Sequence, residues 1–202
     1  MKSIDTSYAD TGAPDGRTPV LSNGALGMLM FIVTEIMFFA SLISAFLIVS
    51  APAQAAGQWP PEGQPRLPVL FTAINSLFLF GSGYYLHRAF KSFGEAVSNE
   101  LVQKMVKTSF LLGCLFVAIQ GFEWIRLLSY GLTMTSSQYG AFFYLIVGTH
   151  ALHAIGALIG LRRAQMKLLR GKLKRSTFQA VLFFWYFVVG IWPILYILVY
   201  LS

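Results

Sequence analysis

The feature that most constrains this chain is a long apolar stretch over residues 25–49 that holds a single carboxyl group. About 20 residues at a rise of about 1.5 Å each cross a hydrocarbon core of about 30 Å, so the stretch is long enough to be a transmembrane helix. Glu35 lies within it, far from either end. An acidic side chain at that depth costs about 2.5 to 3.5 kcal/mol on insertion scales. We therefore expect Glu35 to be protonated, paired, or turned toward a protein interior.

The whole chain has the composition of an integral membrane protein. Of its 202 residues, 56% are hydrophobic and only 11% are charged, and the mean hydropathy is +0.64. A soluble domain does not carry this little charge on this much apolar sequence. The pattern predicts an all-α integral membrane protein whose five transmembrane helices cover residues 24–50, 68–90, 104–128, 139–161 and 177–201.

The segments between these spans also carry predictions. Residues 1–23 form a polar N-terminal arm in which we read no signal peptide, and residues 24–202 form one membrane domain. Pro52 is expected to end the first span, because proline offers no backbone donor. The loop over residues 53–67 places Trp59 at the headgroup level, where indole rings gather.

The basic residues predict how the chain lies across the membrane. The N-terminal arm, the second loop with the adjoining ends of its two spans, and the fourth loop together hold 13 of the 15 Lys and Arg residues. The positive-inside rule assigns these segments to the cytoplasm. The N-terminus is thus expected in the cytoplasm and the C-terminus on the opposite side of the membrane. The net charge of +7 is read as a topology signal, and no nucleic acid is expected as a partner.

Two histidines of the fourth span are the candidate partners of Glu35. Helix rise places Glu35 and His150 each about 17 Å from the cytoplasmic ends of their spans, and His153 about 12 Å. A hydrogen bond from one of these imidazoles would remove much of the cost of burying either group. The alternative is a protonated Glu35 bonded to Thr34, Asn75 or a backbone carbonyl, with a packing role only.

The histidines do not fit a haem or metal centre. His150 and His153 are three residues apart and share one helix face, whereas two axial haem ligands approach the ring from opposite sides. His87 lies near the cytoplasmic end of the second span, and Cys114 is the only cysteine. We therefore expect no cofactor, no metal ion and no catalytic residue in this chain, because metal sites need three or four converging ligands.

The remaining polar and aromatic candidates lie in the third and fifth spans. Gln120, Glu123 and Arg126 share one face at the outer end of the third span, where Glu123 and Arg126 are expected to form an interfacial ion pair. The aromatic fifth span is expected to face lipid or a partner protein. Contacts with lipid or another subunit are thus expected at Trp59, Trp124, Arg126, Trp185 and Trp192.

Six groups of residues, in this order and on these spans, carry a family resemblance. They are Gly27, Met28, Thr34, Glu35, Phe38 and Phe39; Trp59, Pro60, Pro61 and Gly63; Asn75, Ser82 and Gly83; Gln120, Glu123 and Trp124; Tyr139, Gly140, Phe143, Gly148, Thr149, His150, Ala151, Leu152, His153 and Gly156; and Trp185, Trp192 and Tyr196. With them the chain resembles cytochrome c oxidase subunit III, of the haem-copper oxidase subunit III family, over residues 24–201. Five spans are similar to the shorter bacterial members, which lack the first two helices of the mitochondrial type.

The resemblance implies an accessory subunit without a redox centre, packed against catalytic subunit I. It implies two helix bundles separated by a lipid-filled cleft, with phospholipids, subunit II and small subunits as further partners, and with haem and copper held by the partner subunits. It also implies a role in sustained proton uptake and in resistance to inactivation during turnover, and an oxygen path through the lipid. Glu35 matches the family's buried carboxyl, which hydrophobic carbodiimides label.

The chain departs from the family pattern in the last span. Tyr186 and Val189 stand where the family usually has His and Asp, so any polar link that this pair makes in relatives is expected to be absent. Two other functions stay open on the sequence. The same fold would serve a quinol oxidase or a nitric-oxide reductase assembly, and a small independent transporter is a more remote alternative.

Overall fold

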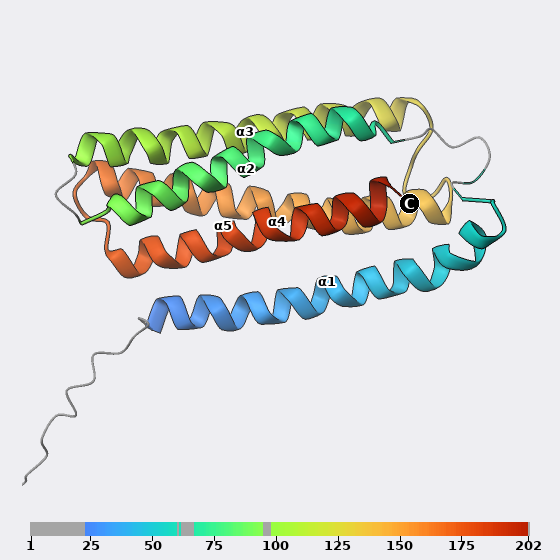
Figure 1. Ribbon diagram of the computed structural model, residues 1–202, viewed down its shortest axis with the longest axis horizontal. Helices are drawn as coiled ribbons and strands as arrows, with labels where there is room; N and C mark the ends of the chain where they lie inside the picture. The colour runs from blue at the N-terminus through green and yellow to red at the C-terminus, as the bar shows by residue number, and fades with distance from the viewer. Residues whose placement is uncertain (1–22, 60, 62–66, 95–97, 202) are drawn as a thin grey trace, which may run out of the picture.

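The computed structural model describes residues 23–59, 61, 67–94 and 98–201. This part of the chain is helical, and its five long helices follow one another along the sequence (Figure 1). They are α1 (Asn23–Ala55), α2 (Val69–Ser92), α3 (Asn99–Ser129), α4 (Gln138–Leu169) and α5 (Arg175–Leu195), and α5 continues into one π-helical turn over Tyr196–Tyr200. All five are long and apolar enough to cross a membrane, as the sequence predicts. Residues 1–22 of the N-terminal arm and residues 60 and 62–66 of the loop between the first two helices lie outside the described residues.

The first helix does not end where the proline predicts. Pro52 lies inside α1, which continues to Ala55, so the expectation that Pro52 ends the span is wrong. The carbonyl of Pro52 still accepts a hydrogen bond from the Ala56 amide at 3.1 Å, and the Gln58 amide reaches the Ala53 carbonyl at 2.8 Å. A proline removes one donor from the helix but leaves its own carbonyl free to accept. The last turn therefore forms beyond it.

The helices at the basic end are longer than hydropathy indicates. α3 begins at Asn99, where the Ser98 side chain accepts a hydrogen bond from the Leu101 amide at 3.4 Å. α4 runs to Leu169 and takes in most of the predicted basic linker. Two residues beyond its end, Gly171 has a φ of +65°, which allows the Lys172 amide to reach the Lys167 carbonyl at 2.8 Å. Charged residues end a hydropathy window, but Lys, Arg and Glu are good helix formers, so both helices continue beyond their predicted apolar spans.

The helices are arranged as four plus one. α2 packs on α3 and α5, α4 also packs on α3 and α5, and α1 lies along the outer side of α4 and α5 (Figure 1). The described helices therefore do not divide into the two bundles that the family resemblance implies. α1 has no second helix beside it on its outer side, so it forms the edge of one bundle and not part of another. It buries only Ala25, Phe39, Phe46 and Ser50.

The core holds two tryptophans that were expected at the surface. Trp185 is 0% exposed and Trp192 is 1% exposed, so the expectation that they contact lipid or a partner is wrong. Gly113 of α3 makes room for the first ring, because a Cβ atom there would lie 2.8 Å from the Trp185 side chain. The second donates its indole N–H to the Ser76 hydroxyl at 2.7 Å. The close approach at Gly113 and the hydrogen bond from Ser76 thus stabilise the two tryptophans of α5 in the core.

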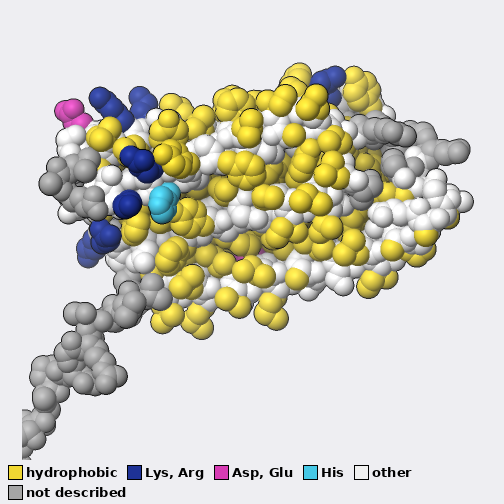
Figure 2. Space-filling model, viewed as in Figure 1, with side chains coloured by type: hydrophobic (Ala, Val, Ile, Leu, Met, Phe, Trp, Pro, Cys, Tyr) yellow, Lys and Arg dark blue, Asp and Glu magenta, His cyan; other side chains and the backbone are white. Residues whose placement is uncertain are grey.

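The surface separates into an apolar middle and a basic end. Figure 2 shows hydrophobic side chains over most of the visible length and a group of Lys and Arg side chains at the end where α3 begins and α4 ends. The chain enters α1 at this same end (Figure 1). This is the distribution on which the predicted membrane orientation depends.

Candidate functional site

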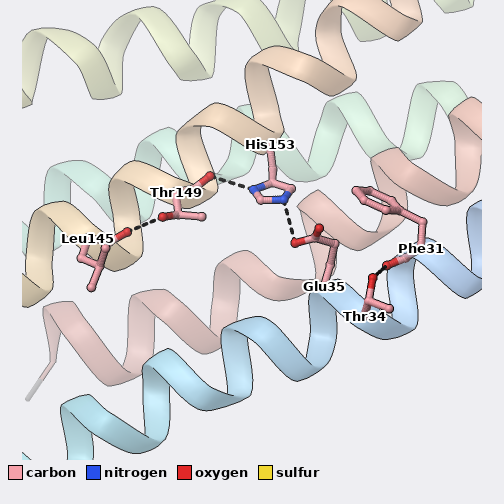
Figure 3. A network of polar contacts seen from close by, with 6 residues as sticks. All are labelled: Phe31, Thr34, Glu35, Leu145, Thr149 and His153. Atoms are coloured by element: carbon pink, nitrogen blue, oxygen red, sulfur yellow. Dashed lines mark hydrogen bonds and ion pairs between the residues drawn. The ribbon is translucent and has the colours of Figure 1, made fainter.

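The carboxyl of Glu35 meets the imidazole of His153 between α1 and α4. Glu35 Oε2 lies 2.9 Å from His153 Nε2, so the predicted hydrogen bond to a fourth-span histidine is present (Figure 3). The other ring nitrogen, Nδ1, lies 2.8 Å from the carbonyl oxygen of Thr149, one turn earlier on α4. Thr34 turns away and donates its hydroxyl to the Phe31 carbonyl at 2.7 Å. In the described part of the chain, neither Thr34 nor Asn75, the alternative partners, forms a hydrogen bond with Glu35.

The two hydrogen bonds of His153 fix how many protons the pair holds. A backbone carbonyl only accepts, so His153 Nδ1 must carry a hydrogen. If the ring is neutral, Nε2 is an acceptor and the Glu35 carboxyl must donate its proton. If the ring is charged, Nε2 donates to a Glu35 carboxylate. In either form one proton lies between Oε2 and Nε2 and the pair has no net charge, which is the state that an apolar site favours.

Aromatic rings surround this pair. Phe39 of α1 lies 5.4 Å from the His153 ring, and Phe184 and Phe187 of α5 lie at 6.2 and 6.0 Å, each between ring centroids. The side chains of His153 and Glu35 are 16% and 17% exposed, so one edge of the pair still reaches the surface of this chain. The pair is therefore shielded by three rings and open on one side.

His150 takes a different position from His153. It is 1% exposed and stacks on Trp192 with ring centroids 5.1 Å apart. Neither of its ring nitrogens has a hydrogen-bond partner in the described part of the chain. His150 also lines a cavity of about 230 Å³ between α3 and α4, with Gln120 and Trp124. The structure thus assigns the Glu35 contact to His153 and leaves His150 in the core.

Asn75 and Gln120 form a second polar group, remote from Glu35. Asn75 donates its amide to the Phe116 carbonyl at 3.1 Å and to Gln120 Oε1 at 3.4 Å. Gln120 in turn donates to the Tyr200 hydroxyl at 2.9 Å. These bonds join α2, α3 and the π-helical turn, so these residues connect helices and do not extend the Glu35 site.

The predicted pair at the outer end of α3 is present. Arg126 donates to the Glu123 carboxylate at 3.3 Å, with the Glu123 side chain 4% exposed and the Arg126 side chain 51% exposed. Trp124 is half-buried against Phe143 and Tyr144. Trp59 packs against Phe46 and Tyr139, with centroids 5.9 and 5.3 Å away. Of the five residues expected to contact lipid or a subunit, only Arg126 is largely exposed on this chain.

The two departures in the last span both face α2. The Tyr186 hydroxyl hydrogen-bonds His87 Nδ1, and the rings lie 6.2 Å apart. Val189 packs on Gly83, where a Cβ atom would lie 3.4 Å from its methyl groups. Position 186 therefore makes a polar contact with α2 through its phenol hydroxyl, which the sequence analysis did not predict. Sequence reasoning missed His87 because the two residues are 99 positions apart.

The chemistry available here is proton exchange between a carboxyl and an imidazole. Among the described residues, no three His, Cys, Asp or Glu side chains are grouped as a metal site would require. The fold and the site together define a class: a multi-helix membrane protein with an acid–imidazole pair in its apolar interior.

Sequence comparisons give the family. The family model for cytochrome c oxidase subunit III matches residues 10–202. The chain is 31% identical over 183 residues to the probable cytochrome c oxidase subunit 3 of Mycobacterium leprae, covering 87% of this chain and 86% of that protein. It is likewise 31% identical to the subunit 3 of Synechocystis (87% and 74% covered), and 33% identical to that of Pan troglodytes (91% and 71% covered). This chain belongs to the cytochrome c oxidase subunit III family.

Proposed function

We propose that this chain is the accessory subunit III of a terminal haem-copper oxidase in a bacterial inner membrane. Its membership of the subunit III family, over almost the whole chain, is the observation that carries this proposal. The chain stabilises catalytic subunit I and supports proton uptake. Haem and copper belong to the partner subunits. Subunit II, small subunits and phospholipids complete the assembly, with the N-terminus in the cytoplasm and the C-terminus in the periplasm.

The exposed side of α1 supports a role in assembly. Large apolar side chains remain uncovered along this helix, among them Met30, Val33, Ile36, Met37 and Ile48. Within a membrane, helices associate through close packing, so such a surface suits either a neighbouring subunit or lipid. Beside it, an apolar groove of about 430 Å³ runs between α1 and α5 and is lined by Leu29, Ile32, Phe183 and Ile194 among others. We assign this groove to structural phospholipid.

The Glu35–His153 pair supports the role in proton uptake. Its shared proton can move between two heavy atoms 2.9 Å apart without changing the charge of the site. We therefore propose that Glu35 and His153 form a proton-holding site next to the catalytic subunit.

Purification through a tag on this chain tests the assembly. We expect a mild-detergent preparation to contain a larger haem-bearing subunit, identified by its optical redox spectrum and by mass spectrometry, and to consume oxygen when given a reductant. The electron donor that supports this uptake, cytochrome c or quinol, identifies the oxidase class. A colourless chain that purifies alone with its native lipid would refute the proposal.

A pair of variants in the same complex tests the proton role. Glu35→Gln keeps a hydrogen-bonding side chain but loses the ionisable proton, while Ser41→Ala changes an exposed hydroxyl on the same helix. We expect the first variant to inactivate in fewer turnovers than the native complex and the second to match it, at equal subunit content. Equal inactivation of all three would contradict a role for Glu35 in proton uptake.

A further inference from the structure

A basic hollow lies between α3 and α4 at the end of the molecule that carries most of the cations. It has a volume of about 580 Å³ and is lined by Glu100, Gln103, Lys104, Lys107, Arg162, Gln165 and Leu169. Three cations from two helices thus face one carboxylate. No carboxylate lies within ion-pair distance of Lys104, Lys107 or Arg162 among the described residues. The hollow therefore has an excess of positive charge.

One of these cations is held in place by its surroundings. Arg162 donates to Gln165 Oε1 at 2.9 Å, and its guanidinium lies 5.8 Å from the centre of the Phe110 ring. Gln165 itself is only 6% exposed, so its amide is fixed between the helices. Arg162 is therefore positioned before any ligand arrives, which lowers the entropic cost of binding an anion.

The hollow lies at the depth of lipid headgroups. Lys107 and Arg126 are the last cations at the two ends of α3, and the 19 residues between these positions correspond to about 28 Å of helix. This is close to the thickness of a hydrocarbon core, about 30 Å. If Arg126 marks one membrane boundary, Lys107 and the hollow mark the other.

An apolar cavity continues the same seam toward the membrane centre. The cavity of about 230 Å³ that Val117, Gly121, Ala151 and Ile155 help to line also lies between α3 and α4. On α3, Lys107 of the hollow and Val117 of the cavity are separated by steps of three and four residues, and so are Arg162 of the hollow and Ile155 of the cavity on α4. Residues spaced in this way share a helix face, so the hollow and the cavity lie along the same face of each helix. Ten residues from Lys107 to Val117 span about 15 Å, half of the hydrocarbon core and the depth of one leaflet.

We propose that the α3–α4 seam is a binding site for one anionic phospholipid. The phosphate group lies in the basic hollow between Lys104, Lys107 and Arg162, and one acyl chain follows the seam to the apolar cavity. Basic pockets between transmembrane helices on the cytoplasmic side are suited to anionic headgroups. The site is separate from the α1–α5 groove and does not depend on the identity of the oxidase.

Exchange of defined lipids tests the site. The protein in its complex is equilibrated with phosphatidylglycerol or with phosphatidylcholine of the same acyl chains, and bound lipid is counted by native mass spectrometry. We expect phosphatidylglycerol to bind more tightly by about thirtyfold, because the three cations and one carboxylate of the hollow leave a net charge of +2 and each positive charge near an anionic surface contributes about 1 kcal/mol. K104Q/K107Q/R162Q should remove this preference. The matched control R163Q/K167Q/R170Q changes the same number of charges outside the hollow and should keep it.

A second variant tests the acyl chain. Gly121 lines the cavity and a Cβ atom there would meet nothing within 4 Å, so G121L introduces a bulky side chain at the cavity without a clash at its Cβ. It should weaken long-chain phosphatidylglycerol several-fold and leave inorganic phosphate binding unchanged. Equal affinity for the two lipids, loss of preference in the control as large as in the triple variant, or full competition by millimolar inorganic phosphate would each overturn the proposal. An unchanged long-chain affinity in G121L would also overturn it.

Discussion

Replacing the two histidines of α4 by phenylalanine, one at a time, is expected to lower stability at His153 and to leave it nearly unchanged at His150. His153→Phe removes the one hydrogen-bond partner that Glu35 has among the described residues and leaves a carboxyl against three aromatic rings. His150→Phe removes two ring nitrogens that have no partner in the described part of the chain and keeps a ring that can stack on Trp192. The two substitutions are identical, three residues apart on one helix, and so form a matched pair.

The magnitude follows from what each ring contacts. A buried polar group that loses its partner costs about 1 to 3 kcal/mol, and Glu35 is 17% exposed, so we expect His153→Phe to lower the free energy of unfolding by about 2 kcal/mol. The Thr149 carbonyl loses the hydrogen bond that it accepts from the imidazole but keeps the backbone hydrogen bond of the helix. Replacing an unpartnered polar ring by an apolar one of similar shape is nearly neutral or stabilising, so His150→Phe should change stability by less than about 0.5 kcal/mol.

A double-mutant cycle isolates the pair. Glu35→Leu, His153→Phe and the double variant are unfolded by titration with sodium dodecyl sulfate, and helix content is followed by circular dichroism. Hydrogen bonds between membrane helices average about 0.6 kcal/mol and reach about 1.7 kcal/mol, and this pair shares a proton between ionisable groups. We therefore expect a coupling energy of about 1 to 2 kcal/mol, with the double variant more stable than His153→Phe.

Two results would refute this reasoning. A coupling energy below about 0.3 kcal/mol would mean that Glu35 and His153 do not stabilise one another. A loss of stability in His150→Phe equal to that in His153→Phe would mean that His150 has a partner essential to the fold.

Three further predictions concern contacts between helices. Gly113→Ala places a Cβ atom 2.8 Å from Trp185 and Leu158, so it should lower the free energy of unfolding by about 1 to 3 kcal/mol. Gly121→Ala is the control, because its Cβ atom meets nothing within 4 Å and it should be near neutral. The same detergent titration compares the two variants. Tyr186→Phe removes the hydrogen bond to His87 and should lower the free energy of unfolding by about 0.5 to 1.5 kcal/mol. Tyr85→Phe, on an exposed ring, is the control. Equal effects of the two substitutions would argue against the hydrogen bond. Tyr200→Phe removes the acceptor of the Gln120 amide and should cost about 1 kcal/mol, measurable as faster hydrogen exchange near Gln120, and unchanged exchange would contradict it.

Helix number and the Glu35 contact could be predicted from the sequence because both depend on distance along a helix. A rise of about 1.5 Å per residue fixes the depth of every side chain, so the sequence could bring Glu35 and the fourth-span histidines to similar heights. It could not choose between His150 and His153, because the choice depends on the rotation of α4 about its own axis. That rotation is set by packing, here by Trp192 against the His150 ring.

The wrong predictions, which concern the exposure of the α5 tryptophans and the division into two bundles, also arise because packing between helices cannot be read from the sequence. Whether an aromatic residue of α5 faces lipid or the core depends on how closely α3 approaches, and Gly113 decides this from another part of the chain. The arrangement of four helices plus one depends on which faces meet, which hydropathy along the chain does not record. The start of α3 was open to prediction, since Ser98 followed by Asn99 and Glu100 is a typical helix start.

The contacts of α5 with α2 have a consequence for combining this chain with its relatives. Tyr186 and Val189 are matched by His87 and Gly83 on the other helix, one pair through a hydrogen bond and one through shape. A chimaera that imports the last helix of a relative with His and Asp at these positions would meet a surface adapted to a phenol and an isopropyl group. Because the residues of α2 and α5 are matched to one another, a hybrid of this chain and such a relative should exchange both helices together.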